Sequence, residues 1–166
     1  MNKNKHIVLV YFGDFFYDAR LNNIALSLIK ENYQVTFIGV TTRVIPMKMF
    51  QKINFHSIKI TWTGKMKYLQ FYFRVKKILQ NMKYSRIISG DLYSLAPIIS
   101  ATQNNQKIIY DCREIYFELA AHAKKPIYKL FNYIYEKKYL SSVDSVLVTA
   151  KTDLDLLQKT YKKHNH

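Results

Sequence analysis

The sequence predicts an α/β fold, with one domain over residues 1–166 that has a mostly parallel sheet and helices on both faces. Short apolar segments rich in β-branched and aromatic residues alternate with longer segments whose apolar residues recur at helical spacing. The glycines fall at or just after the ends of the expected strands, where a backbone turns or approaches a ligand; they are Gly13, Gly39, Gly64 and Gly90. A chain of 166 residues is also long enough to bury one hydrophobic core.

The first part of the chain contains two expected strands and the helix between them. Residues 7–12 form an apolar run that is typical of a buried strand. Residues 18–32 predict a helix, and its apolar side chains at helical spacing are Leu21, Ile24, Ala25, Leu28 and Ile29. We expect Asp18 to cap the start of this helix. Residues 34–40 are rich in β-branched and aromatic side chains and predict the second strand.

The middle of the chain predicts a loop, a strand and a long helix. Residues 41–55 are expected to form a loop that Pro46 interrupts, and residues 57–62 indicate a third strand. Gly64 then turns the chain into a helix over about residues 65–83. One apolar stripe of this helix is expected to face the sheet, and its members are Tyr68, Phe71, Tyr72, Val75, Ile78, Leu79 and Met82.

The rest of the chain repeats the alternation. The expected strands are 86–89, 107–111 and 145–149, and the expected helices are 93–103, a segment with Pro126 in its first turn that ends near 140, and 152–161. Parallel strands that are joined by helices require crossover connections, which place the helices against the faces of the sheet. The alternation therefore indicates a single Rossmann-like domain.

The charge of the chain is high and uneven. The formal net charge is +15, from 26 basic and 11 acidic residues, and no Asp or Glu occurs between Glu31 and Asp91. Basic residues of this interval include Lys48, Lys59, Arg74 and Lys83. A region with charges of one sign attracts anionic partners. A coding bias toward lysine and asparagine is the alternative explanation for part of the excess.

Composition narrows the class of protein. The hydrophobic content of 49% excludes a disordered chain, and no apolar run approaches the roughly 18 residues that a transmembrane helix needs. Residues 7–12 are too short for a signal peptide and lack a small-residue cleavage site. The single Cys112 rules out an internal disulfide and fits a reducing compartment. We therefore expect a cytoplasmic protein.

The common cofactor motifs are missing. A dinucleotide-binding loop needs three glycines after the first strand, and only Gly13 is present there. Gly64-Lys65 is followed by Met66, so the sequence lacks the Ser or Thr of a phosphate-binding P-loop. No His/Cys cluster has the spacing of metal ligands, and no serine lies in a nucleophile elbow. We expect no cofactor and no metal.

The most informative segment lies at the end of the strand 107–111. Asp111, Arg113, Glu114 and Glu118 bring three carboxylates and a guanidinium to this point. In open α/β sheets, ligands bind at the carboxyl ends of the strands, so this segment predicts a binding or catalytic site. The alternative is an ordinary solvated loop between a strand and a helix.

Five motifs follow one another along the chain. They are Asp18-Ala19-Arg20, the step Asn32-Tyr33-Gln34-Val35 into a strand, the strand end Ser89-Gly90-Asp91, the strand end Asp111-Cys112-Arg113-Glu114, and Glu136 followed by Val143-Asp144-Ser145-Val146. In this order the chain resembles the N-terminal, acceptor-side domain of a family-4-type glycosyltransferase of the GT-B fold. The resemblance extends over residues 7–161. It implies that the Rossmann-like domain is one half of a GT-B fold.

The resemblance also implies a set of site residues. The expected catalytic residues are Asp111, Arg113 and Glu114. The expected substrate-binding residues are Gly13, Asp14, Asp18, Arg20, Gly90, Asp91 and Glu118. Arg113 stands where the family often has a histidine, so the role of that histidine near the transferred sugar does not carry over. A guanidinium can instead hold a phosphate or a carboxylate through two hydrogen bonds.

In this family a second Rossmann domain with a Glu-x7-Glu pair holds most of the nucleotide-sugar. The sequence ends at residues 163–166, about where a linker to such a domain would begin. The resemblance therefore implies an acceptor-side half that is inactive alone, works with a C-terminal donor-binding subunit, and acts on a glycan or a lipid-linked acceptor. The alternative is a non-catalytic membrane-associated or scaffold subunit that retains the fold. Nucleic-acid binding is not expected, because the sequence has no RRM aromatic pair, zinc finger or KH loop.

The helix expected at residues 65–83 also carries a candidate membrane contact. Apolar side chains outside its core-facing stripe lie beside lysines; this set is Lys65, Met66, Lys67, Leu69, Phe73, Lys76 and Lys77. Exposed apolar residues with lysines around them are typical of a helix that lies on anionic lipid. We therefore expect peripheral binding to the inner face of the plasma membrane. The alternative is that Met66, Leu69 and Phe73 pack under the loop at 41–56.

Overall fold

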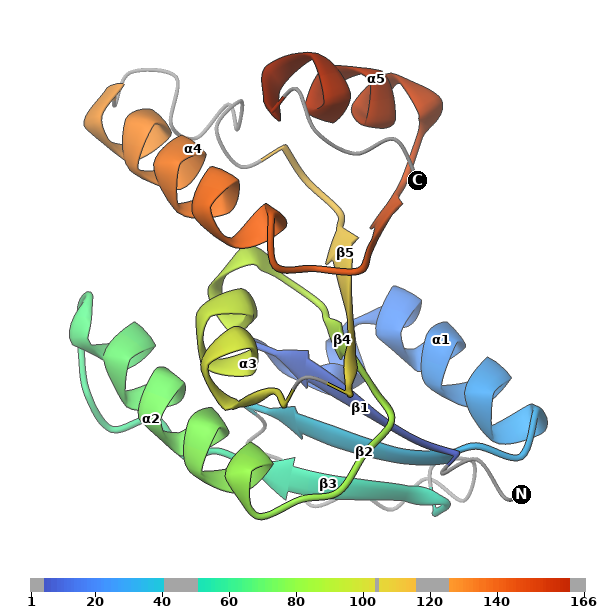
Figure 1. Cartoon of the computed structure of the whole chain (residues 1–166). Helices are drawn as coiled ribbons and strands as arrows, with labels where there is room; N and C mark the ends of the chain where they lie inside the picture. Colours follow the sequence, from blue (N-terminus) through green and yellow to red (C-terminus); the bar gives the residue numbers. More distant parts are fainter. Residues whose placement is uncertain (1–4, 41–50, 104, 116–125, 162–166) are drawn as a thin grey trace.

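The structure is a computed structural model that describes residues 5–40, 51–103, 105–115 and 126–161. Within these residues a single sheet is formed by β1 (His6–Tyr11), β2 (Gln34–Gly39), β3 (Ile53–Ser57), β4 (Arg86–Ser89), β5 (Lys107–Cys112) and β6 (Ser145–Val148). The helices are α1 (Ala19–Lys30), α2 (Met66–Gln80), α3 (Leu95–Ala101), α4 (Pro126–Leu140) and α5 (Lys151–Tyr161), and the 3-10 turns are η1 (Phe15–Tyr17) and η3 (Leu92–Ser94). Figure 1 shows their arrangement.

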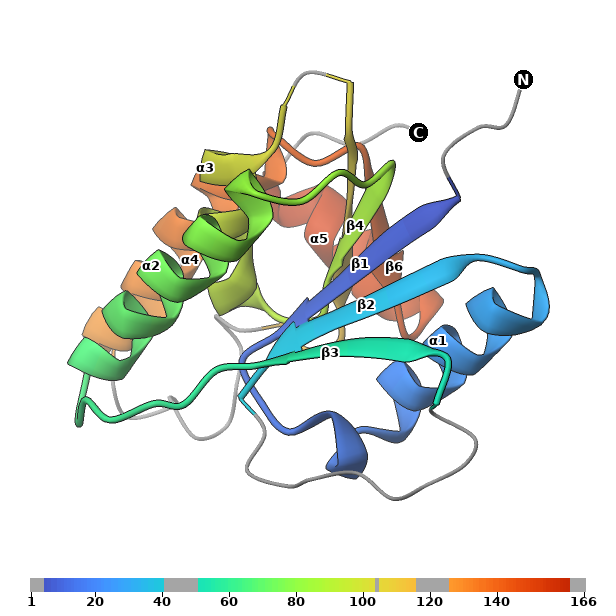
Figure 2. The ribbon, with the colours of Figure 1, turned by 90° about the horizontal axis from the view of Figure 1, so that it is seen from below.

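Every neighbouring pair of strands is parallel, and their order across the sheet is β3-β2-β1-β4-β5-β6 (Figure 2). The chain builds outward from β1 to β3 and then returns to the other side of β1 with β4. In doubly wound sheets the point where the strand order reverses is where ligands bind, outside the carboxyl ends of the strands. The predicted fold class, a single Rossmann-like α/β domain, is confirmed, and the reversal point lies between β1 and β4.

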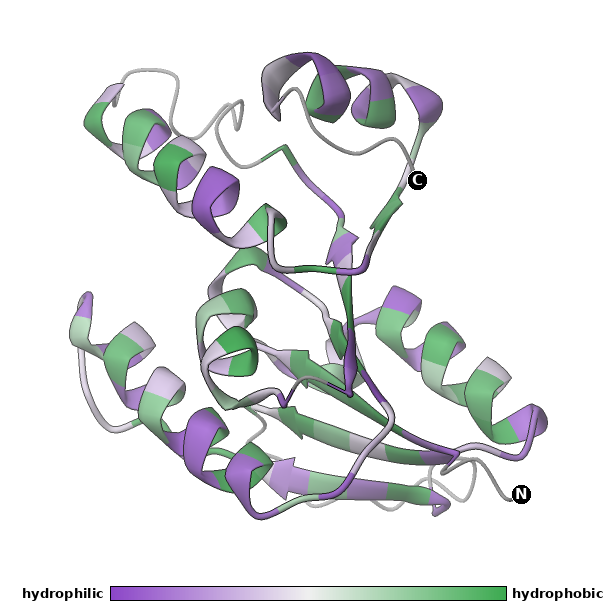
Figure 3. Ribbon diagram, in the orientation of Figure 1, coloured by the Kyte–Doolittle hydropathy of each residue, from purple (hydrophilic) through white to green (hydrophobic). Residues whose placement is uncertain are grey.

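Helices cover both faces of the sheet because side chains along a strand point to its two faces alternately. In β1, Val8 and Val10 pack on the face that α2 and α3 cover. Ile7 and Leu9 pack on the opposite face, which α1 covers. The strand is therefore buried on both sides and reads as a continuous apolar run, as the strands of parallel sheets commonly do. Figure 3 shows the apolar residues along the central strands in green.

Both ends of α1 agree with the sequence. The Asp18 side chain accepts a hydrogen bond from the Leu21 N–H at 2.8 Å, which confirms Asp18 as the N-cap. At the other end Asn32 has a φ of 61°, the left-handed conformation that commonly follows a helix. The Tyr33 N–H then donates to the carbonyl of Leu28 at 2.9 Å, which closes the last turn. These contacts stop α1 so that β2 can begin at Gln34.

The strand expected at residues 57–62 is wrong in position, because the third strand of the structure is Ile53–Ser57, which begins in the expected loop and shares only Ser57 with the expected strand. The register with β2 explains the shift: Ser57 pairs with Gly39, the last residue of β2. The Ile58 N–H donates one more hydrogen bond to the Gly39 carbonyl at 2.8 Å, and the ladder ends there. The length of β2 therefore decides where β3 stops.

Residues 58–62 resemble a strand in sequence, but in the structure the backbone N–H groups of Thr61 and Trp62 bond to a side chain and not to a neighbouring strand. The Oε1 atom of Gln70 accepts hydrogen bonds from the Thr61 and Trp62 N–H groups at 2.9 and 3.0 Å. Gln70 is buried in α2, so these bonds anchor the segment to that helix. Gly64, with a φ of 57°, then turns the chain into α2.

None of the helices in the described ranges is long and apolar enough to cross a membrane. The longest, α2 and α4, have 15 residues each. Such helices are shorter than the roughly 20 residues that span a bilayer.

The left-handed conformation at Asn32 yields a stability prediction. Replacing Asn32 with alanine should lower the free energy of unfolding by about 1 kcal/mol, because a Cβ without a local polar partner disfavours this conformation. Replacing Asn32 with glycine should leave the stability equal or higher. Urea unfolding of the two variants measures the difference. The control is Asn23→Ala at an exposed position inside α1, where alanine favours the helix; an equal loss in both alanine variants would contradict the explanation.

Candidate functional site

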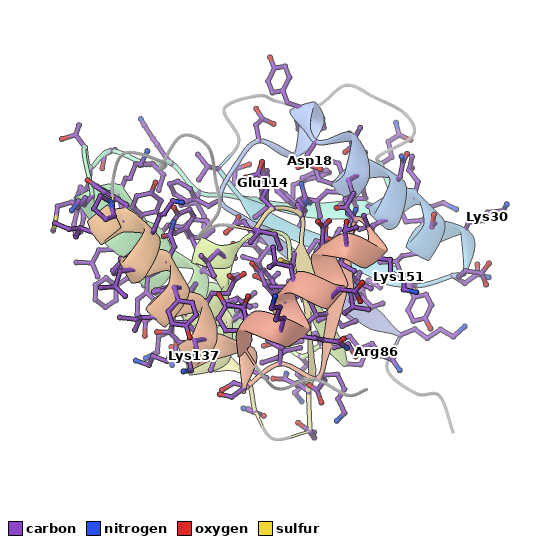
Figure 4. The ribbon with its side chains drawn as sticks, turned by 90° about the horizontal axis from the view of Figure 1, so that it is seen from above. Asp18, Lys30, Arg86, Glu114, Lys137 and Lys151 are labelled. Atoms are coloured by element: carbon purple, nitrogen blue, oxygen red, sulfur yellow. The ribbon has the colours of Figure 1, made fainter. Side chains whose placement is uncertain are left out.

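The carboxyl ends of β1, β4 and β5 and the start of α1 meet at one edge of the sheet, on both sides of the reversal point between β1 and β4. This edge carries the segment after β1, the Gly90-Asp91 step after β4 and the segment 111–114 after β5. Figure 4 shows Asp18, from the start of α1, and Glu114, from the end of β5, in the same part of the molecule. Residues far apart in the sequence therefore share one site.

Asp111 is the centre of this site. It lies at the end of β5 with no exposed surface. Arg20 donates two hydrogen bonds to its carboxylate, from Nη2 at 2.6 Å and from Nε at 3.1 Å. A third bond comes from Nε of Arg113 at 3.0 Å. Asp111 alternates along β5 with Tyr110, which points to the opposite face, and this parity aims the carboxylate at α1, where Arg20 lies.

Arg113 links Asp111 to the start of α1. Its Nη1 atom makes an ion pair with Asp18, the same carboxylate that caps α1. Its guanidinium also lies over the ring of Tyr11, 5.1 Å from the centroid. Burial alone would lower the pKa of Arg113, but the hydrogen bond and charge of Asp18, together with Asp111, outweigh it and raise the pKa. Arg113 therefore stays charged, and two arginines balance two aspartates.

This balance limits what each group does chemically. Both oxygens of Asp111 accept hydrogen bonds from arginines, and the carboxylate has no exposed surface. Arg20 reaches further, and its Nη1 donates to Oγ1 of Thr149 at 3.3 Å. The Arg20 side chain is 35% exposed and can contact an anionic ligand. Nη2 of Arg113 is buried and has no hydrogen-bond acceptor among the residues that the structure describes.

Asp91 holds the two central strand ends together. Its Oδ2 atom accepts from the Phe12 N–H at 2.5 Å, and its Oδ1 atom accepts from the Ser94 N–H at 2.8 Å. Burial raises the pKa of Asp91, although the hydrogen bonds from Phe12 and Ser94 oppose the shift. Gly90 precedes it in a narrow space, where an added Cβ would lie 3.3 Å from the Val10 carbonyl oxygen. Both residues shape the edge through packing and capping.

The remaining predicted residues differ in position. Asp14 caps η1 by accepting from the Phe16 N–H at 3.0 Å. Gly13 lies against the ring of Tyr11, which an added Cβ would contact at 2.3 Å. Glu118 lies outside the described residues.

Glu114 is the exposed carboxylate of the predicted catalytic set. Its side chain has no hydrogen bond or ion pair with the described part of the chain. It lies near Tyr93, whose pKa rises to about 12 through burial first, then through Tyr68 and Asp91, with a small contribution from Glu114. The set Asp18, Arg20, Asp111 and Arg113 is thus brought into one network, and Glu114 stands beside it. The catalytic role of these residues stays a prediction.

Sequence reasoning missed Tyr11, Phe12 and Thr149. All three lie at the same edge: Tyr11 ends β1, Phe12 follows it, and Thr149 follows β6. The rule that ligands bind at the carboxyl ends of parallel strands would have marked each position. Their partners would not have been found, since Tyr11 contacts Arg113 and Thr149 contacts Arg20 across the fold.

The predicted membrane residues lie on α2, except Lys65, which directly precedes it. Met66, Leu69 and Phe73 are 52%, 42% and 55% exposed, so they are not buried by any part of the chain that the structure describes. Lys65 and Lys77 are exposed as well. Whether these side chains contact lipid stays a prediction. In the described ranges, no group of three or more His, Cys, Asp or Glu residues could hold a metal ion.

Comparison with known proteins identifies the family. A family model described as "Glycosyl transferase 4-like" matches residues 6–148. The match contains every site residue described above except Thr149, which follows its last residue. A search of curated proteins found no match.

The buried network predicts that Asp111 is needed for folding and Glu114 is not. Asp111→Asn should lower the free energy of unfolding by about 3 kcal/mol, because it leaves two partly buried guanidiniums without their shared carboxylate. Glu114→Gln should leave the melting temperature unchanged or slightly raised, within about 0.5 kcal/mol. Denaturant unfolding of both variants measures this. Equal stabilities would show that the ion pairs contribute little to folding.

Proposed function

Because the chain belongs to the glycosyl transferase 4-like family, we propose that it is the acceptor-side half of an enzyme that transfers a sugar from a nucleotide-sugar. The acceptor is a cell-surface glycan or a lipid-linked molecule. The observation that carries the proposal is the network of Asp18, Arg20, Asp111 and Arg113 at the reversal point of the sheet. Ligands bind at such points in open α/β sheets.

In this proposal the groups of the network have separate tasks. Asp111 fixes the two guanidiniums, and Arg20 offers its exposed part to a phosphate or carboxylate of the ligand. Glu114 accepts the proton of the acceptor hydroxyl as that oxygen bonds to the sugar, the bond between the sugar and the diphosphate breaks, and the nucleoside diphosphate leaves; an accessible carboxylate can perform this task. The donor is held mainly by a second domain or subunit, and the chain supplies the other wall of the cleft.

Transfer assays with a candidate donor-binding partner test this function. With the partner present, Glu114→Gln should lower transfer by about tenfold or more, since one positioned acid–base group contributes typically 10²–10⁴. Radiolabelled transfer to a lipid or glycan acceptor measures the rate. The matched control is Asp153→Asn, which removes one carboxylate charge from the first turn of α5.

Three results would contradict the proposal. If the chain alone bound UDP- or GDP-sugars at micromolar concentration in calorimetry, the donor would not need a second domain. If Glu114→Gln were destabilised but fully active, Glu114 would be structural. Absence of transfer with every partner, in a correctly folded chain, would favour the non-catalytic scaffold alternative.

We also propose that the chain works at the inner face of the plasma membrane and binds it peripherally through α2. The support is the exposed apolar set Met66, Leu69 and Phe73 on α2, with exposed lysines at Lys77 on the same helix and at Lys65 just before it. Apolar side chains enter the boundary of the lipid, and the lysines attract anionic head groups.

Binding to anionic vesicles should therefore depend on salt and on α2. Removing two lysines in Lys65→Gln/Lys77→Gln should weaken binding, at on the order of 1 kcal/mol for each lysine near the surface. The control Lys30→Gln/Lys151→Gln removes the same charge from exposed positions on α1 and α5 (Figure 4) and should bind normally. Vesicle sedimentation below and above about 0.15 M salt measures the effect. Equal partitioning into neutral and anionic vesicles would reject this account.

A further inference from the structure

The helix α4 presents an apolar stripe to solvent. Ile127 is 80% exposed, and Leu130, Phe131 and Ile134 are each more than half exposed. Their spacing places them on one side of the helix. Figure 3 shows the green, apolar segments in the outer half of α4. A globular protein rarely exposes such a stripe unless it binds something.

The opposite side of α4 faces inward, where Leu140 packs in the core beside buried polar side chains. Glu136 is fully buried and accepts hydrogen bonds from the hydroxyls of Tyr110 and Tyr161, each at 2.8 Å. Asn132 is buried on the same side. Burying Glu136 raises its pKa, and these hydroxyls oppose the shift. The inner side of α4 therefore holds the helix to the domain through these hydrogen bonds and through core packing, while the outer apolar stripe has no part in either contact.

A groove lies between α2 and α4, which cover the same side of the domain (Figure 2). Its volume is about 410 Å³, within the range of small-molecule sites. Apolar and aromatic side chains line it, and these include Tyr68, Tyr72, Tyr93, Ile127, Phe131 and Tyr135. A mostly apolar groove of this kind suits a hydrocarbon chain more than a sugar.

Aromatic contacts join the groove to the candidate site. The rings of Tyr68 and Tyr93 lie 4.5 Å apart, and the ring of Phe12 lies 4.9 Å from Tyr68. The Phe12 N–H in turn donates to Asp91 at the reversal point of the sheet. A ligand in the groove therefore ends beside Tyr93, near Glu114 and the Gly90-Asp91 step.

The charge beside the groove is positive. Lys65 lines it, with its Nζ atom 5.1 Å from the ring centroid of Tyr128. Lys67 lies next to it, with Nζ 5.1 Å from the ring centroid of Tyr68. The sequence has no acidic residue between Glu31 and Asp91, so nothing within α2 neutralises these lysines. An apolar chain that ends in a phosphate matches both the lining and the charge.

We propose that this groove binds the hydrocarbon chain of a lipid-linked acceptor, with Lys65 at its phosphate and its sugar-accepting end at the edge formed by β1, β4 and β5. The proposal rests on the proposed function and names the acceptor class. The apolar stripe of α4 and the exposed residues of α2 flank the groove, so the chain passes from the membrane into the groove without crossing water.

Binding of dodecyl phosphate below its micelle concentration tests the groove. Calorimetry should detect binding, and Phe131→Ala should weaken it by about tenfold, because an aromatic side chain of the lining is lost. The matched control is Leu130→Ala, which removes an equally exposed apolar side chain that does not line the groove. Ile127→Gln is a second lining variant at a position too exposed to unfold the domain. Lys65→Gln should weaken dodecyl phosphate but not dodecanol.

Several outcomes would overturn the proposal. Equal losses in Phe131→Ala and Leu130→Ala would indicate general surface partitioning. Inorganic phosphate that bound as tightly as dodecyl phosphate would show that the chain of the ligand is not recognised. A dimer in sedimentation that Phe131→Ala abolishes, without dodecyl phosphate binding, would make a second copy the occupant. Because the assay measures binding and not transfer, loss of transfer with intact groove binding would count against the proposed function alone.

Discussion

The carboxylate of Asp111 is the contact on which the arrangement of the site depends. A buried carboxylate is costly unless its charge is paired and hydrogen-bonded, and here Arg20 and Arg113 supply both. Arg20 comes from α1, 91 residues away in the sequence, so the pairing holds the first helix against the end of β5. The position of Arg113 then fixes its contact with Asp18, which starts α1. The four charged side chains form one network of ion pairs.

That network joins the two halves of the sheet across the point where the strand order reverses. On the opposite face, Asp91 joins the ends of β4 and β1, because its carboxylate accepts hydrogen bonds from the Phe12 N–H after β1 and from the Ser94 N–H in η3. The edge is therefore rigid on both faces of the sheet, and Glu114 stands on it with an exposed carboxylate. In the proposed function, such a fixed frame of arginines would stabilise a charge that develops during transfer, because preorganised charges need no reorganisation at that moment.

The two sides of α4 differ, and its outer side adds an apolar area to the surface beside the site. Leu140 and the tyrosines on the inner side of α4 pack in the core, whereas Ile127, Leu130, Phe131 and Ile134 on its outer side are exposed. Together with the exposed residues of α2 they form an apolar rim around an aromatic groove that leads to the site. The domain thus combines a charged edge, suited to polar and anionic groups, with a neighbouring apolar face. An acceptor that has both a hydrocarbon chain and a sugar or phosphate would contact both.

Local patterns in the sequence determined the fold class, most element positions and the Asp18 cap, because each depends on residues within a few positions of one another. They also pointed to the ends of the strands as the site. The pairing of Asp111 with Arg20, the end of β3 at Ser57 and the groove between α2 and α4 were decided only by the tertiary structure. Each depends on which strands become neighbours and which face a side chain meets, and contacts between distant residues leave no periodic signal in a single sequence.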